Sequence, residues 1–362
     1  MIERLTVHYF RNLVKADDLI FRRLNLLYGS NGSGKTSLLE ALYYLIMGRS
    51  FRAHQLQKII NYQQSGFRVA GLLHKGDRYW RIGIERGFDH AAVSRIDGEN
   101  VSSQAAITAL QPVQLLNYDS NRLLSDAGVY RRQFADWGLF HQQEDFMVIW
   151  RSFERAVKQR NFALRAQTTP NYLRGWNNEL VHYGVRLSEC RRGYLLSFNQ
   201  LYQQFAQALF PDEPLMLRYY QGWPDTMDLA EALEREQARD FKMGYTTIGP
   251  QRADWWFELS DGRNVRDVYS RGQQKLLVFS LQLAQGMMLY KTTQRSCLYL
   301  IDDLLAELDQ NSYQRLLKQL TSLPSTHSQF FITGLLPSTL PEELVQLYPD
   351  WQQRQVQCGV IS

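Results

Sequence analysis

Gly29-Ser30-Asn31-Gly32-Ser33-Gly34-Lys35-Thr36 forms a complete G-x-x-x-x-G-K-[ST] phosphate-binding loop near the start of the chain. The apolar run 24–28 before the loop predicts a buried strand, and the apolar spacing of 37–45 after it predicts a helix. A strand, a glycine-rich loop and a helix in this order are the setting that the motif requires. The loop therefore predicts a nucleoside triphosphate site and organises the fold around it.

Each part of the loop has an expected role. Glycines let the backbone turn its N–H groups toward a polyphosphate, and the following helix adds its positive dipole end. Lys35 is expected to bind the β- and γ-phosphates of ATP and to assist catalysis, and the Thr36 hydroxyl to bind Mg²⁺. The predicted nucleotide-binding residues of this segment are Gly29, Ser30, Asn31, Gly32, Ser33, Gly34, Lys35, Thr36 and Ser37.

A second part of the nucleotide site is predicted in the C-terminal third. The apolar run 297–301 ends in Asp302-Asp303, the form of a Walker B strand. Asp302 is expected to hold Mg²⁺ through water, and Asp303 to be the catalytic carboxylate that polarises the attacking water. Together with the phosphate loop, this acid pair predicts hydrolysis as well as binding.

The stretch Ser270-Arg271-Gly272-Gln273 opens an amphipathic helix just before this strand and resembles the S-x-G-Q signature of ATP-binding-cassette ATPases. In those proteins the Ser and Gly at the helix N-terminus bind the γ-phosphate that is held by a second subunit. Ser270, Gly272 and Gln273 are therefore predicted nucleotide ligands in trans. The stretch 306–309 fits the D-loop of the same dimer interface.

These elements predict an ATP-dependent homodimer that hydrolysis opens. Two departures from transporter ATPases predict slow turnover. Asp303 replaces the usual Glu, and Thr333 replaces the usual switch His, where it is expected to contact the nucleotide.

Composition favours an anionic partner. The chain has 362 residues and a formal net charge of +5, and the segment 151–200 carries nine Lys or Arg against three Asp or Glu.

The three cysteines, Cys190, Cys297 and Cys358, form no C-x-x-C pair, which favours a reducing cytoplasm over a zinc site. The sequence shows no signal peptide and no stretch suited to spanning a membrane.

The order of elements predicts an α/β fold. We expect an ABC-type ATPase head with a mixed sheet around the phosphate loop, an antiparallel β meander over 66–101 and an inserted compact α-helical lobe. The helices of the lobe are expected to be of moderate length, with interruptions that include Thr169-Pro170 and Gly175. The predicted borders are 1–139 and 245–362 for the two halves of the head, and 140–244 for the lobe.

The whole chain closely resembles the bacterial RecF family. Seven stretches in one order carry the resemblance: 10–12, 29–36 with 39–41, 48–52, 130–137, 249–254, 270–273 and 300–309. Gln251 and Ala253 depart from the family pattern Gly-Pro-His-Arg-Asp-Asp, whereas Arg252 and Asp254 match it.

The resemblance implies a cytoplasmic, weak DNA-dependent ATPase that dimerises with ATP on double-stranded DNA near single-strand gaps. It implies action with RecR and RecO to load RecA, in replication restart and the SOS response. Arg11 and Asn12 match positions near the nucleotide in related heads, and Arg52 is a candidate for the same place; structural ion pairs are the alternative. Gln114, in a predicted strand, is the candidate γ-phosphate sensor, with a catalytic and a metal-binding role.

Three other classes remain as alternatives. A transport-associated ATPase normally carries a His at the position of Thr333, and a chromosome-organising or zinc-hook tether needs heptad repeats that the chain lacks. A small-molecule kinase would leave Ser270-Arg271-Gly272-Gln273 unexplained.

Overall fold

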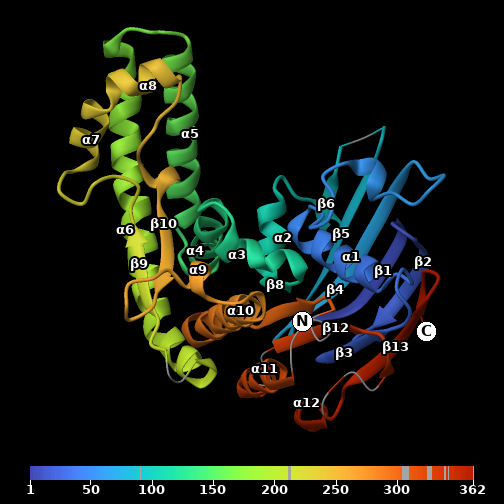
Figure 1. The fold of residues 1–362 in the computed structure, drawn as a ribbon. Helices are drawn as coiled ribbons and strands as arrows, with labels where there is room; N and C mark the ends of the chain where they lie inside the picture. Colours follow the sequence, from blue (N-terminus) through green and yellow to red (C-terminus); the bar gives the residue numbers. More distant parts are fainter. Residues whose placement is uncertain are drawn as a thin grey trace. The chain divides into compact units, whose positions relative to one another are not determined.

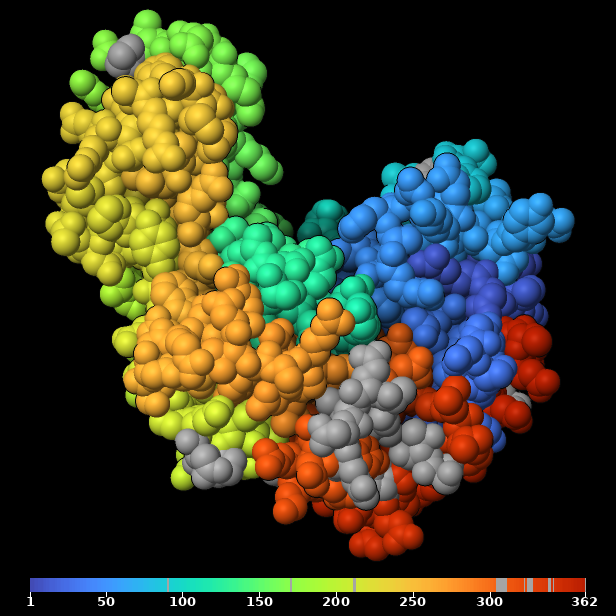
Figure 2. Space-filling model, in the orientation of Figure 1, coloured from blue at the N-terminus to red at the C-terminus, as the bar shows by residue number. Residues whose placement is uncertain are grey.

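The computed structural model describes residues 1–89, 91–210, 213–303, 310–323, 328–337, 340 and 342–361. These residues group into two compact units, Met1–Ser120 with Gly286–Ser362, and Asn121–Gln285. The first unit holds both ends of the chain, and Figure 2 shows its N-terminal (blue) and C-terminal (red) parts side by side. The borders predicted from the sequence, after residues 139 and 244, both fall inside the second unit and stay predictions of where the helical insertion begins and ends.

An antiparallel sheet forms one layer of the first unit, with the spatial strand order β2-β1-β4-β5-β6-β7 (Figure 1). Its inward residues, such as Leu5, Val7 and Val69, are fully or almost fully buried, while their neighbours face water, so the meander predicted over 66–101 is confirmed. The strands are β1 (Ile2–Phe10), β2 (Leu13–Ile20), β4 (Gly66–Lys75), β5 (Arg78–Gly87), β6 (Val93–Ile96) and β7 (Glu99–Asn100).

Strand β2 has no counterpart among the predicted strands. It buries only every third residue, Leu13, Ala16 and Leu19, so it lacks the alternation of a half-buried strand. A register shift in the β1–β2 pair accounts for the step from Ala16 to Leu19, because Leu5 lies opposite Leu19 whereas Val7 lies opposite Ala16. The extra residue is a β-bulge, and Asp18 within it has a positive φ of 52°.

The second sheet of the first unit carries the nucleotide motifs. Its order is β14-β13-β3-β12-β11-β8, and all neighbours except β13–β14 are parallel. Strands β11 and β12 are buried along their whole length, as expected for parallel strands covered on both faces. The strands are β3 (Leu24–Tyr28), β8 (Val113–Leu116), β11 (Cys297–Ile301), β12 (Ser328–Gly334), β13 (Gln352–Gln357) and β14 (Val360–Ile361).

Helix α1 (Lys35–Met47) begins directly after the phosphate loop and is buried on nearly all sides. It contacts β1, β4 and β5 of the antiparallel sheet and β8 and β12 of the parallel sheet, which explains why apolar residues surround it. Helix α2 (Gln104–Leu110) packs beside it. Among the described residues, the other α-helices that lie wholly in this unit are α11 (Gln310–Ser322) and α12 (Glu342–Leu347).

The second unit is built mainly from helices, so the predicted fold class is confirmed. Helices α5 (Phe146–Arg165) and α6 (Pro170–Leu209) pack along each other and break at Thr169-Pro170, as predicted. The other helices are α3 (Arg122–Ser125), α4 (Val129–Gln142), α7 (Leu229–Arg235), α8 (Gln237–Met243) and α9 (Val265–Val268), with α10 (Arg271–Thr293) continuing into the first unit.

The predicted interruption at Gly175 is wrong. Helix α6 continues through Gly175 for 40 residues, a length of about 60 Å. One glycine costs a helix only about 1 kcal/mol relative to alanine. Burial of Leu173, Leu180 and Leu187 along α6 outweighs this cost.

The two strands in the described part of the second unit form a sheet of their own. Strand β10 (Asp254–Glu258) pairs with β9 (Met216–Tyr220) in a separate two-stranded ladder, rather than with either sheet of the first unit. Figure 1 shows this ladder beside α6.

Two of the family-like stretches, 130–137 and 249–254, meet inside the second unit. Arg131 donates to Asp254 over 2.6 and 2.9 Å, and the Trp255 indole donates to the Arg131 carbonyl. Arg191 pairs with Asp136 at 2.8 Å and donates to the Pro250 carbonyl. The match at Asp254 is therefore a structural ion pair.

No helix in the described ranges combines the length and the apolar character needed to cross a membrane.

Candidate nucleotide-binding site

The phosphate loop lies between the end of β3 and the start of α1. Gly29, Gly32 and Gly34 have φ values of 155°, 78° and 119°, which residues with a side chain rarely adopt. A Cβ on Gly29 would also lie 2.2 Å from the Val356 carbonyl oxygen. The motif's glycines are thus required by backbone geometry, and the loop has the curved form that exposes N–H groups to an anion.

Lys35 is held against this loop. Its ammonium donates to the carbonyl oxygens of Gly29 and Ser30 at 2.8 and 3.0 Å, and its side chain is almost fully buried. The residue at the N-cap of α1 is Gly34, which has no side chain to cap the helix. The helix end therefore offers N–H groups to a phosphate beside a fixed positive charge.

The loop is supported from two sides by residues far away in the sequence. The Asn12 amide donates to the Gly32 carbonyl at 3.2 Å, and the Gly359 N–H donates to the Ser33 carbonyl at 2.8 Å. Gly359 has φ 80°, and a Cβ there would lie 2.0 Å from the Asn12 carbonyl oxygen. The β13–β14 turn is thus part of the loop's support, although its sequence carries only an ordinary turn signal.

The acid pair meets Thr36 at the carboxyl edge of the parallel sheet. Thr36 donates to Asp302 at 2.9 Å, and Thr333 at the end of β12 lies 3.1 Å from Asp302 and 3.2 Å from Asp303. The Asp303 N–H donates to the Thr333 hydroxyl at 2.8 Å. Asp303 has a positive φ of 47°, and this hydrogen bond stabilises the turn that sets the direction of its carboxylate.

Burial raises the pKa of Asp302, and the neighbouring Asp303 carboxylate raises it further; hydrogen bonds from Thr36 and Thr333 and the charge of Arg52 act in the opposite direction. A buried carboxylate beside a second carboxylate is stabilised by a cation. Among the described residues no three His, Cys, Asp or Glu side chains form a metal cluster. One carboxylate and one hydroxyl suit Mg²⁺, which keeps waters and phosphate oxygens as its other ligands.

A buried carboxylate organises the arginines at the mouth of the site. Glu40 on α1 is fully buried and accepts from the Arg11 guanidinium at 2.6 and 2.9 Å. Arg52 lies 3.7 Å from the same carboxylate, and the Ser50 hydroxyl also donates to it. Arg11 and Arg52 are thus both ion-paired and placed beside the phosphate loop. The sequence alone singles out Glu40 only as a member of the family-like stretch 39–41.

We expect Glu40→Gln to lower the free energy of unfolding by about 3 kcal/mol, because it leaves the Arg11 guanidinium without its buried counter-charge. Urea denaturation measures this change. Asp18→Asn is the matched control, since it breaks an exposed guanidinium–carboxylate pair with Arg4, worth less than about 1 kcal/mol. Equal effects of the two variants would contradict the role of Glu40.

A pocket of about 530 Å³ lies at the phosphate loop. Its size is in the range of small-ligand sites, and its charged lining is mostly basic, with Asp303 as the acidic member. The described lining residues are Arg11, Asn12, the stretch 31–37, Arg52, Lys58, Ile60 and Asp303. The structure thus brings together residues 31–37 of the predicted loop, Arg11, Asn12 and the catalytic candidate Asp303.

Gln114 is not brought to this pocket. It lies inside β8 opposite Tyr299, two residues before the strand ends, and is absent from the described lining of the pocket. The Asp302 N–H donates to the Leu116 carbonyl, so the residue level with the acid pair is Asn117 rather than Gln114.

The signature stretch lies at the N-terminus of α10. The Ser270 N–H donates to the Gln273 side chain at 2.9 Å, and the Gln273 N–H donates to the Ser270 hydroxyl at 3.3 Å. This is a reciprocal capping box. Ser270 and Gly272 are exposed or half-exposed, and a Cβ on Gly272 would meet no atom within 4 Å. The predicted D-loop stretch, 306–309, lies outside the described residues.

Two sheets around a phosphate loop, a Walker-type acid pair and a helix that begins with the signature stretch define the class: an ATPase head of the ABC and SMC type. The family model described as RecF/RecN/SMC N terminal domain matches residues 1–353. The DNA replication and repair protein RecF of Shewanella denitrificans is 36% identical over 343 residues, covering 95% of this chain and 94% of the relative. RecF of Coxiella burnetii is 38% identical over 339 residues, covering 94% of each. The chain belongs to the RecF family.

Solved structures agree on the fold. The structure of the recombination mediator protein RecF with ATP in the RecFOR pathway aligns with a TM-score of 0.86 at 23% identity, covering 100% of this chain and 96% of that one. The Smc head bound to the C-winged helix domain of ScpA aligns with a TM-score of 0.58 at 15% identity, covering 100% and 96%. At these identities the likeness concerns the fold alone.

Proposed function

We propose that this protein is an ATP-dependent DNA-binding clamp of recombinational repair. The observation that carries the proposal is the assembled nucleotide site, in which Thr36 and Asp302 are in contact beside a preformed phosphate loop. Membership of the RecF family supports its use on DNA, because the curated relatives are named as DNA replication and repair proteins.

The residues divide the chemistry of ATP hydrolysis among them. Lys35 and the α1 N-terminus bind the phosphates, and Arg11 and Arg52 add positive charge at the mouth of the pocket. Mg²⁺ held by Thr36 and Asp302 would neutralise charge on the β- and γ-phosphates. Asp303 orients the attacking water, and Thr333 fixes Asp303. The short carboxylate of Asp303 and the absence of the usual switch His at Thr333 favour slow ATP hydrolysis.

Dimerisation completes the proposed site. The exposed N-terminus of α10, with Ser270 and Gly272, would bind the γ-phosphate held by the phosphate loop of a second copy. ATP then closes the homodimer and hydrolysis opens it.

The proposed DNA contact is the outer face of α5. Arg151, Arg155, Lys158 and Arg165 are all exposed and recur at helical spacing, and the one acidic residue of α5, Glu154, is half-buried. Arg155 pairs with Glu179 at 3.5 Å, while the other three make no ion pair with any residue that the structure describes. Their seven-residue steps place charges about 10 Å apart along the helix, as suits a phosphate backbone.

The number of basic residues in the segment 151–200 is larger than the number available to bind DNA. Arg160 is fully buried and pairs with Asp240 at 2.6 Å, and Arg191 is buried against Asp136. These two charges stabilise the second unit. The proposed interface is therefore narrower than the segment 151–200 suggested.

Fluorescence anisotropy of a labelled gapped duplex, without nucleotide, with ADP and with ATP, tests the proposal. We expect tight binding only with ATP, loss of binding in Lys35→Arg, and on the order of a thousandfold loss of affinity between about 50 and 200 mM salt. The triple variant Arg151→Gln, Lys158→Gln, Arg165→Gln should bind at least about tenfold more weakly and reduce the slope of log affinity against log salt by about 3.

The matched control is Arg235→Gln, Arg239→Gln, Lys242→Gln, which removes three exposed basic charges from α7 and α8 of the same unit. It should bind like the unchanged protein. An equal loss in both triple variants would mean that net charge rather than the α5 face governs binding. DNA binding of equal strength with and without ATP would contradict the proposal of an ATP-dependent clamp.

The proposed setting is the cytoplasm, with RecO and RecR as partners that together load RecA onto gapped DNA during replication restart and the SOS response. Support comes from the family and from the solved RecF structures placed in the RecFOR pathway.

A further inference from the structure

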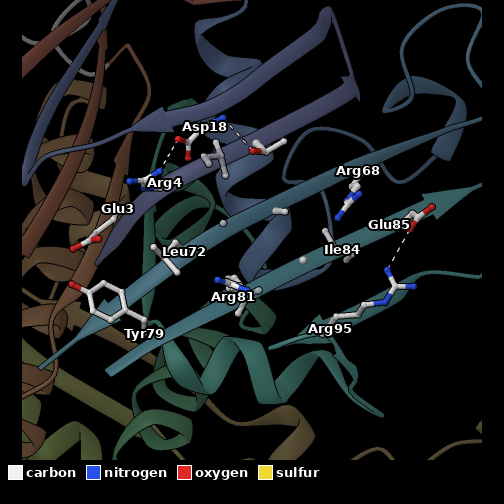
Figure 3. Close-up of a pocket in the computed structure, with 17 residues that line it drawn as sticks. Glu3, Arg4, Asp18, Arg68, Leu72, Tyr79, Arg81, Ile84, Glu85 and Arg95 are labelled. Carbon is white, nitrogen blue, oxygen red and sulfur yellow. Dashed lines mark hydrogen bonds and ion pairs between the residues drawn. The ribbon is translucent and has the colours of Figure 1, made fainter. Parts of the chain in front are cut away.

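The open face of the antiparallel sheet carries a hollow of about 750 Å³, larger than the pocket at the phosphate loop. Figure 3 shows that side chains from several neighbouring strands line it. All described lining residues lie between Glu3 and Gly98, within the first unit, and none of them lines the nucleotide pocket. The hollow therefore has a chemistry of its own.

Strand register explains the hollow. Thr6 lies opposite Ala70, Ala70 opposite Gly83, and Gly83 opposite Arg95, so a row of small side chains crosses the middle of the face. On one side of this row, Arg68 lies between His8 and Glu85; on the other, Leu72 lies between Arg4 and Arg81. Small residues form the floor, and longer side chains form the two walls.

The walls carry two positive charges that have no counter-ion among the described residues. Arg4 pairs with Asp18 at 2.7 Å and Arg95 with Glu85 at 3.4 Å. Arg68 and Arg81 are exposed and make no ion pair with any residue in the described part of the chain. Figure 3 shows Arg68 and Arg81 on neighbouring strands. Arg68 and Leu72, the residue opposite Arg81, are four residues apart on β4, about 14 Å along the strand.

We propose that this face binds an extended acidic segment of a partner protein with the pattern acidic–x–apolar–x–acidic. In an extended peptide, alternate side chains point the same way, and residues four apart are about 14 Å from each other. The two acidic side chains meet Arg68 and Arg81. The apolar side chain between them fills the hollow above Ala70 and Gly83.

Mixed charge favours a peptide over nucleic acid. Glu3, Asp18 and Glu85 also line the hollow, so a continuous row of phosphates would meet three carboxylates. A peptide places its two charges only where the arginines lie. Leu72 and the half-exposed Tyr79 add apolar surface, which a peptide side chain uses and a phosphate backbone does not.

A fluorescein-labelled nine-residue peptide, with glutamates four positions apart, leucine midway and serine or glycine elsewhere, is the probe for anisotropy titration. The unchanged protein should bind it at least tenfold more tightly than the same peptide with lysines for glutamates. Arg68→Glu with Arg81→Glu should weaken binding at least tenfold. Gly83→Leu should do the same by filling the floor; a Cβ there meets its nearest atoms only at 3.8 Å, so the sheet tolerates it.

Lys15→Glu with Arg78→Glu is the matched control, because it makes the same charge change on exposed residues outside the lining. It should keep peptide binding. ATP binding should be unchanged in every variant, which separates this surface from the nucleotide site. Equal affinity for the glutamate and lysine peptides would overturn the proposal. So would a loss of duplex DNA binding, without loss of peptide binding, in the Arg68 and Arg81 variant.

Discussion

Replacing Asp303 by asparagine is expected to reduce steady-state ATP hydrolysis on the order of a hundredfold or more while ATP still binds. Asparagine keeps the shape of the side chain and tolerates the positive φ of 47° at this position, so the turn after β11 is preserved. The lost charge is the one that would accept a proton from the attacking water. A phosphate-release assay measures turnover, and equilibrium dialysis with labelled ATP measures binding.

Asp302→Asn separates the two acids. It removes the carboxylate that Thr36 contacts, so it should weaken ATP binding in the presence of Mg²⁺ far more than in its absence. Asp303→Asn should show no such dependence. If Asp303→Asn hydrolyses ATP at the unchanged rate, another residue activates the water, and the assignment of Asp303 is wrong.

The parts of the nucleotide site that the sequence predicted are those with local causes. The phosphate loop needs glycine at backbone angles that other residues avoid, so its geometry can be predicted from the sequence of 29–36. The acid pair follows directly from the end of a buried strand. Both were predictable because each motif is continuous in the sequence and carries its own structural context.

Glu40 and Gly359 were not predictable in the same way. In the sequence, Glu40 is a polar residue in an otherwise apolar helix. Its role becomes clear only from the fold, which brings the guanidinium groups of Arg11 and Arg52 to its carboxylate at the mouth of the pocket. Gly359 matters because the chain returns to within hydrogen-bonding distance of Ser33. Such roles arise from pairings across 12 to 326 residues, which local patterns do not encode.

Gln114 and the basic segment show a different limit. Gln114 is predicted from its place near the end of a strand between the phosphate loop and the insertion, but strand register puts it opposite Tyr299 instead of level with Asp302. In the segment 151–200 the count of charges was correct, yet composition does not distinguish Arg160, buried in an ion pair, from Lys158, exposed on α5. Register and burial are tertiary quantities, so neither follows from a count.

Ser270→Arg is expected to weaken ATP-dependent dimerisation at least about a hundredfold while each monomer still binds ATP. The arginine side chain would occupy the space where the α10 N-terminus must approach the γ-phosphate of the second copy, and a cation opposes the positive end of the helix dipole. Sedimentation velocity with ATP, in an Asp303→Asn background that prevents turnover, measures the dimer.

Ser270→Ala is the control that isolates the capping hydroxyl, because it removes the bond to the Gln273 N–H without adding bulk or charge. Loss of a cap costs about 1 kcal/mol of helix stability. The alanine variant should therefore weaken the dimer less than Ser270→Arg, because it loses the hydroxyl but adds neither bulk nor charge. A full dimer in Ser270→Arg would remove Ser270 from the interface, and the exposed capping box at α10 would then be a helix start and nothing more.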